Sequence, residues 1–151
     1  MKRIGVISDT HGRVRQWALE ILHKTHMILH AGDIGSPDVI STLETIAPVT
    51  AVRGNMDKGS WSYHYNLTEA VEIEGRYFYM VHDVEDLDIE PAGQFDGVIS
   101  GHTHMPGKKI KNGVLYFNPG SAGHRRPGKP VSLGILEITA QGIEARIIKK
   151  D

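Results

Sequence analysis

The sequence has no cysteine among its 151 residues. This absence excludes disulfide bonds, thiolate metal sites and a cysteine nucleophile, so a metal ion bound by this chain has only nitrogen and oxygen ligands. Proteins of reducing compartments rarely carry structural disulfides, and we therefore expect a cytoplasmic protein.

The chain also lacks long apolar runs and an excess of charge of one sign. Its N-terminal segment reaches Asp9 after a short apolar stretch, without the hydrophobic segment of a secretory signal, and no later stretch approaches membrane-spanning length. The formal charge of -1 provides no basic field for nucleic acid or an anionic membrane. We therefore expect a small-molecule partner, no membrane partner and no strong binding of nucleic acid.

The length fits one domain with a single buried core. In the first third, short β-branched runs alternate with stretches whose apolar residues recur at helical spacing. Strands are expected at 4–7, 27–29 and 49–52, and helices at 13–25 and from Pro37, with Ser36 as N-cap, to before Pro48. This alternation favours parallel strands covered by helices.

Hairpin signals dominate the rest of the chain. The turn sequences Glu74-Gly75, Asn112-Gly113 and Ala140-Gln141-Gly142 each separate two apolar or β-branched runs. We expect this part to be mainly antiparallel. No repeat or linker divides the chain, so the predicted fold is one α/β domain over residues 1–151, a two-sheet β-sandwich of mixed strands flanked by helices.

Side chains that can bind metals follow five of the expected strands. They are Asp9 and His11, Asp33, Asn55, His82, and the pair His102 and His104. Since the carboxyl ends of strands form the binding crevice of open α/β sheets, we expect these residues to converge. The mixture of imidazole, carboxylate and amide oxygen suits first-row divalent metals better than calcium.

Each of these residues also has an ordinary structural explanation. Asp9 alone would suit a turn or cap, His82 a core position, and Gly54-Asn55 a turn. His102 and His104 are more informative, because alternate residues of an extended segment point to the same side. The ordered set favours a metal site, since a protein core has no use for so many clustered ionisable groups without partners.

The series Asp9-x-His11, Gly32-Asp33, Gly54-Asn55-x-Asp57, His82 and Gly101-His102-x-His104 resembles the signature of the calcineurin-like metallophosphoesterase superfamily. With the length and the later run Asn118-Pro119-Gly120-Ser121, the chain is most similar to small single-domain prokaryotic phosphodiesterases. The resemblance covers nearly the whole chain and implies the superfamily's β-sandwich with flanking helices.

The resemblance also implies two divalent ions per chain, Mn foremost, with Fe, Zn, Ni or Co as alternatives. Asp9, His11 and His104 would hold one ion, Asn55, His82 and His102 the other, and Asp33 would bridge them. Such a pair lies about 3.5–4 Å apart and activates a hydroxide that attacks phosphorus. We therefore expect a phosphodiesterase acting on small esters, nucleotide derivatives among them.

Alternatives remain open at this point. A phosphomonoesterase or a dinucleoside-polyphosphate hydrolase would share the metal site, and a non-catalytic protein-binding scaffold of the same fold, like the retromer subunit that resembles it, would not need every ligand. We also expect a homodimer or higher homo-oligomer, because exposed hairpin edges suit isologous contacts.

The candidate catalytic residues are Asn55, Asp57 and His124. His124, Arg125, Arg126 and Lys129 could place cationic donors over a substrate phosphate or form a solvated loop. For Trp61, Tyr63 and Tyr65, local packing is favoured over stacking on a nucleobase, and for His30 a structural role in the strand. Asp83 follows His82 where the superfamily usually has glycine.

Met56 stands where the superfamily often has a histidine that protonates the leaving oxygen, and a thioether cannot donate a proton. General acid help is typically worth about 10²–10⁴-fold, so we expect the rate to depend steeply on leaving-group pKa, with nitrophenyl esters cleaved readily and alkyl esters slowly. Met56→His should flatten this dependence and add a basic limb to the pH profile. A shallow dependence in the unmodified protein, lost in His124→Ala, would contradict this account.

Overall fold

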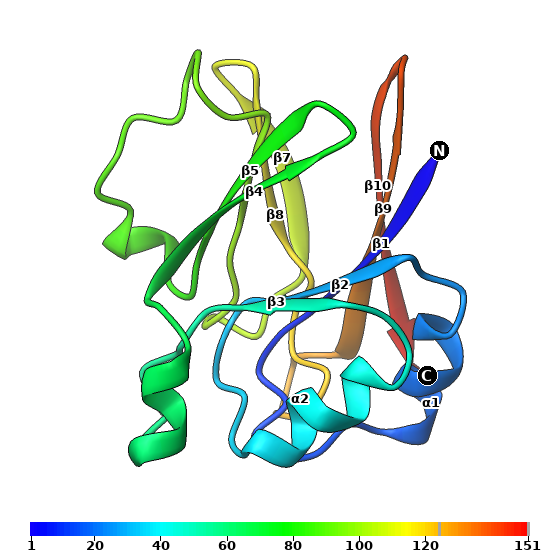
Figure 1. Cartoon of the computed structure of the whole chain (residues 1–151), viewed down its shortest axis with the longest axis vertical. Coiled ribbons are helices and arrows are strands. Elements are labelled where there is room, and N and C mark those ends of the chain that lie inside the picture. The colour runs from blue at the N-terminus through cyan, green and yellow to red at the C-terminus, as the bar shows by residue number, and fades with distance from the viewer. Residues whose placement is uncertain (124, 151) are drawn as a thin grey trace.

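Two five-stranded β-sheets pack face to face in the computed structural model, which describes residues 1–123 and 125–150 (Figure 1). The first sheet has the order β10-β9-β1-β2-β3 and the second β4-β5-β6-β8-β7. The strands are β1 (Lys2–Ile7), β2 (Met27–His30), β3 (Val49–Ala51), β4 (Thr68–Ile73), β5 (Arg76–Val81), β6 (Gly97–Ile99), β7 (Gly107–Lys111), β8 (Val114–Asn118), β9 (Val131–Thr139) and β10 (Gly142–Lys150). The predicted α/β fold, a two-sheet β-sandwich of mixed strands flanked by helices, is confirmed.

The main core lies between the two sheets. On β1, Ile4 and Val6 face this core, while Ile7 faces the opposite side, as expected from the alternation of side chains along a strand. Phe78 of β5 and Phe117 of β8 are the largest fully buried side chains that meet them from the second sheet. The contact of the sheets therefore depends on aromatic rings from the second sheet.

Both α-helices, α1 (Gln16–Leu22) and α2 (Pro37–Glu44), cover the outer face of the first sheet (Figure 1). The predicted N-cap, Ser36, is extended and precedes Pro37 at the first helical position. The observed helix α1 is shorter than the one predicted over 13–25, and it begins only at Gln16 because Arg15 is extended. No helix within the described residues is long and apolar enough to cross a membrane.

The outer face of the second sheet is covered by a loop segment instead of α-helices. Residues 82–96, which include the short 3₁₀ helix η2 (Val84–Asp86), place Leu87 and Ala92 over Val81, Val98 and Val114. In the part of the chain that the structure describes, the α-helices therefore flank the first sheet, and a segment with one short 3₁₀ helix covers the second.

Three consecutive strands run parallel in each sheet, β1-β2-β3 in the first and β5-β6-β8 in the second. The predicted hairpins β4–β5, β7–β8 and β9–β10 are confirmed. The parallel interior of the second sheet was missed, because the β5–β6 connection contains no α-helix whose periodicity would mark a crossover. The carboxyl ends of parallel strands are thus available from both sheets.

Gly134 of β9 lies so close to the Phe117 ring that a Cβ atom would overlap it. We expect Gly134→Ala to lower the free energy of unfolding by about 1–3 kcal/mol through overpacking, measured by urea denaturation. Gly107→Ala is the matched control, since a Cβ atom there meets nothing within 4 Å. Equal stability of the two variants would contradict this contact.

Candidate metal centre

The predicted ligands come from loops that leave the parallel strands. Asp9, Asp33 and Asn55 follow β1, β2 and β3, while His82 follows β5. His102 and His104 follow β6. The structure brings five of the seven residues into one largely buried group, which we call the metal cluster: Asp9, His11, Asp33, His82 and His104.

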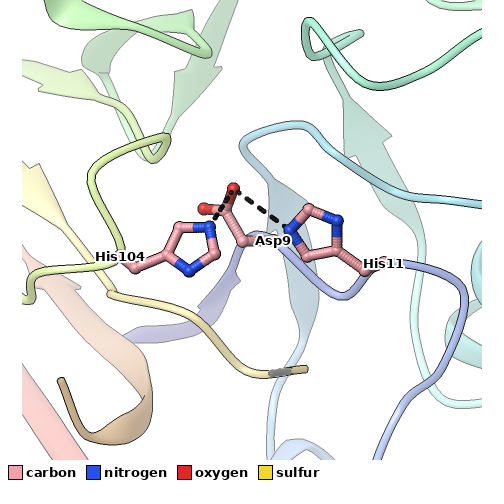
Figure 2. A group of neighbouring side chains, drawn as sticks. All are labelled: Asp9, His11 and His104. Atoms are coloured by element: carbon pink, nitrogen blue, oxygen red, sulfur yellow. Dashed lines mark ion pairs between the residues drawn. The ribbon is translucent and has the colours of Figure 1, made fainter. Parts of the chain in front are cut away.

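Asp9 is at the centre of the metal cluster. Its Oδ2 accepts hydrogen bonds from Ser8 Oγ (2.7 Å) and from the His102 backbone N–H (3.1 Å). Its Oδ1 faces Nε2 of His104 at 3.3 Å and Nε2 of His11 at 3.9 Å, and Figure 2 shows these two rings on either side of the carboxylate. Nε2 of His82 is also 3.9 Å from this oxygen.

Burial governs the protonation of Asp9. It raises the pKa of this carboxyl group to about 6, although His82 and the hydroxyl of Ser8 lower it. The Oδ1 atom is buried and accepts no hydrogen bond from the described residues. A buried acceptor without a partner is costly, and a cation would satisfy it.

His82 is oriented as metal-binding histidines usually are. Its Nδ1–H donates to the backbone carbonyl of Ala31 at 2.7 Å, which turns the Nε2 atom towards Asp33 Oδ2 at 3.3 Å. This Nε2 is buried and has no hydrogen-bond partner among the described residues. Burial lowers the pKa of His82, but the contact with Asp33 and the charge of Asp9 hold it above its usual value.

Two groups of side chains could each hold a cation. Within Asp9, His11 and His104, and within Asp9, Asp33 and His82, one ligand atom per residue lies within 4.8 Å of the others. Imidazole and carboxylate donors fit first-row divalent metals. The carboxylate common to both groups is that of Asp9, and the bridging role that the resemblance gives to Asp33 stays a prediction.

Asn55 and His102 lie at the exposed rim of the metal cluster, outside those two groups. The Nδ1 atom of His102 is 3.2 Å from Asn55 Oδ1, and its Nε2 is 3.5 Å from Asp83 Oδ2. The imidazole is therefore held between an amide and a carboxylate. Sequence reasoning noted Asp83 only as a departure from the superfamily pattern and did not find this contact.

Asp57 holds together two of the loops that carry predicted metal ligands. Its carboxylate accepts the backbone N–H groups of Ile34 (3.1 Å), Gly35 (2.9 Å) and Gly54 (2.8 Å). These bonds tie the loop of Asp33 to the loop of Asn55. The catalytic role expected of Asp57 stays a prediction, and His124, the third candidate, lies outside the described residues.

His30 has the structural role that was expected. It accepts the Gly32 N–H at Nδ1 (3.1 Å), so its Nε2–H donates to Thr10 Oγ1 (3.0 Å), which in turn donates to the Ile34 carbonyl (2.8 Å). Complete burial lowers the pKa of His30 to about 3. The neutral ring thus joins the loops after β1 and β2.

The ligand residues adopt an unusual backbone conformation. Five of them have a positive φ: Asp9 (55°), His11 (50°), Asp33 (54°), His102 (73°) and His104 (62°). The other described non-glycine residues with positive φ are Glu74 and Asn112, both in hairpin turns. A left-handed conformation costs a non-glycine residue roughly 1 kcal/mol, and such strain collects at functional sites.

The model of the calcineurin-like phosphoesterase superfamily domain matches residues 1–141. The chain belongs to this superfamily. This calcineurin-like phosphoesterase is 34% identical to a probable metallophosphoesterase of Methanothermobacter thermautotrophicus, over 97% of this chain and 91% of the relative. It is 31% identical to a phosphodiesterase of Methanocaldococcus jannaschii, over 89% and 92%.

Solved structures agree with this assignment. An archaeal phosphodiesterase superposes on this calcineurin-like phosphoesterase with a TM-score of 0.79 at 29% identity, covering 98% of this chain and 99% of that one. Wild-type Vps29 of Entamoeba histolytica in complex with zinc has a TM-score of 0.75 at 23% identity, covering 97% and 98%. The likeness to Vps29 shows the fold alone.

Metal binding to this calcineurin-like phosphoesterase should depend on pH through Asp9, because a ligating carboxylate must be deprotonated. Below pH 6 a cation must displace the proton, so the apparent Mn²⁺ affinity should fall by about tenfold per pH unit. The rise in Tm on adding Mn²⁺, followed by thermal unfolding, should therefore shrink as the pH falls through 6.

The stability of the metal-free protein should show the opposite trend and fall as the pH rises. The pKa of Asp9 is raised from its ordinary value of 3.8 to about 6, so its contribution to folding stability is fully present below pH 3.8 and is lost as the pH rises through about 6. Asp9→Asn removes the titrating group and is the control for both trends. A metal-induced rise in Tm that is equal at about pH 5 and pH 7 would contradict this role of Asp9.

Proposed function

We propose that this protein is a phosphodiesterase that hydrolyses small phosphate esters with two divalent cations at the metal cluster. The observation that carries the proposal is the buried Oδ1 atom of Asp9, which faces three imidazole nitrogens and accepts no hydrogen bond from the described residues. Membership of the superfamily and relatives named as phosphodiesterases support it.

Asp9, His11 and His104 would hold the first cation and Asn55, His82 and His102 the second, with Asp33 bridging the two. Manganese is the foremost candidate, with iron, zinc, nickel or cobalt as alternatives. When bound, the cations would polarise the phosphate and lower the pKa of a water molecule enough for it to act as the nucleophile.

The chain contributes a rigid set of ligands. The Ser8 hydroxyl and the His102 N–H fix Asp9, the Ala31 carbonyl fixes His82, and Asp57 joins two ligand loops. Such preorganisation means that little rearrangement is needed when charge develops on the phosphate. Met56, which is 58% exposed beside Asn55, offers no proton to the leaving oxygen.

A cationic loop lies beside the first group of ligands. Burial, followed by the charges of Arg126, His11 and Lys129, lowers the pKa of His104 to about 4. Lys129 Nζ is engaged by the carbonyl of Thr103 at 2.8 Å, whereas Arg126 is exposed. Arg126 is therefore the better candidate for holding a substrate phosphate.

Self-association is also part of the proposal. Strand β7 is exposed along its whole length at the edge of the second sheet, and Ile110 on it is 75% exposed. An edge of this kind suits an isologous contact between two copies. A scaffold role is not proposed, since all seven predicted ligand residues are present.

Two variants test the arrangement of the cations. Asp33→Asn should weaken both sites together if Asp33 bridges, whereas His11→Ala should chiefly empty one, as measured by elemental analysis of loaded protein. Hydrolysis of an activated aryl phosphodiester should stop on chelation and return with Mn²⁺. At most one ion per chain in fully loaded protein, or activity that survives complete metal removal, would refute the proposal.

A further inference from the structure

A cleft of about 480 Å³ opens at the rim of the metal cluster. Asn55, His82 and His102, three of the predicted metal ligands, are among the residues that line it. The His82 side chain is only 6% exposed, and its Nε2 atom lies 3.3 Å from Asp33 Oδ2 of the metal cluster. The cleft therefore adjoins the metal cluster, and its volume is in the range of small-molecule sites.

The lining of this cleft combines two kinds of side chain. Leu67, Thr68 and Val81 are uncharged, whereas Asp83, Asp86 and Asp88 contribute carboxylates, which we call the acidic wall. The acidic wall belongs to the segment after β5, and hydrogen bonds hold its first and last carboxylates. Asp83 Oδ1 accepts the Glu85 N–H (3.0 Å), and Tyr79 Oη donates to Asp88 Oδ1 (3.2 Å).

Arg53 is the one cation that lines the cleft within the described residues. Its guanidinium lies over the ring of Tyr63, 5.2 Å from the centroid, and Tyr63 is 74% exposed. Trp61 and Tyr65 pack against the hydrophobic cluster beneath the helices, as the sequence favoured. Three carboxylates and one guanidinium thus line the cleft, so the charged side chains of its lining sum to a negative charge.

We propose that this cleft receives the alcohol part of the substrate ester and selects it by charge. Asp86 and Asp88 accept hydrogen bonds from hydroxyl or cationic groups, because a carboxylate accepts and does not donate. An arm that carries a second anionic group is repelled, which is specificity by an unfavourable contact. This inference rests on the proposed function, since the arm enters the cleft only when the phosphate lies at the metal cluster.

The proposal predicts which candidate substrates this cleft favours and which it disfavours. Esters of nucleosides, glycerol or amino alcohols present hydroxyl or cationic groups to the acidic wall. Dinucleoside polyphosphates present further phosphates, so they are disfavoured. Asp83 contacts His102, a predicted metal ligand, so a change at Asp83 would also disturb the metal site, and Asp86 is the better position for a test.

The test uses three p-nitrophenyl alkyl phosphodiesters of equal length, whose alkyl arm ends in a hydroxyl, a trimethylammonium or a carboxylate group. All three release the same p-nitrophenolate. For Mn²⁺-loaded protein, kcat/KM should be at least about fivefold higher for the hydroxyl and trimethylammonium arms than for the carboxylate arm, the effect of one partly screened charge contact. Asp86→Lys should narrow or invert this ratio.

Glu144→Lys is the matched control, because it makes the same change of charge at an exposed position of β10 that does not line the cleft. It should leave the ratio unchanged. Preference of the unmodified protein for the carboxylate arm, or equal changes of the ratio in both variants, would overturn the proposal. So would an additional divalent ion bound at Asp86 and lost in Asp86→Lys.

Calorimetric binding of the three alkyl phosphate products separates the cleft from the hydrolysis. If no ester is turned over but the products bind in the predicted order of charge, the proposed function fails and the role of the cleft stands. If the esters are hydrolysed and the products bind without regard to charge, the role of the cleft fails and the proposed function stands.

Discussion

The burial of the Asp9 carboxylate is the constraint on which the rest of the structure depends. This side chain has no solvent exposure and lies at the end of β1, between the two sheets. One of its oxygens is fixed by Ser8 and the His102 backbone, and the other faces the imidazoles of His11 from the first sheet and of His82 and His104 from the second. A buried charge needs opposite charge nearby, so the packing of the sheets and the binding of cations are two parts of one arrangement.

The fold supplies the geometry that this arrangement requires. Parallel strands in both sheets end towards the same region, and their loops turn through left-handed residues to direct Asp9, Asp33 and His104 inwards. Asp57 satisfies three backbone N–H groups of these loops. The strain of the loops is thus compensated by hydrogen bonds that leave the ligand atoms available.

Much of this could be predicted from the sequence, because local rules decide it. Turn sequences such as Asn112-Gly113 mark hairpins, Ser36-Pro37 marks a helix start, and polar residues after apolar runs mark the metal cluster. Other features have no local signal. The parallel pairing of β6 depends on strands remote in sequence, and the contact of Asp83 with His102 exists only after both loops fold.

The most direct test of the central claim is anomalous diffraction from crystals of Mn²⁺-loaded protein, recorded at the manganese absorption edge. We predict two peaks about 3.5–4 Å apart, both bonded to Asp33, one also to Asp9, His11 and His104 and the other also to Asn55, His82 and His102. A single peak in fully loaded crystals, or peaks remote from Asp9, would contradict the account.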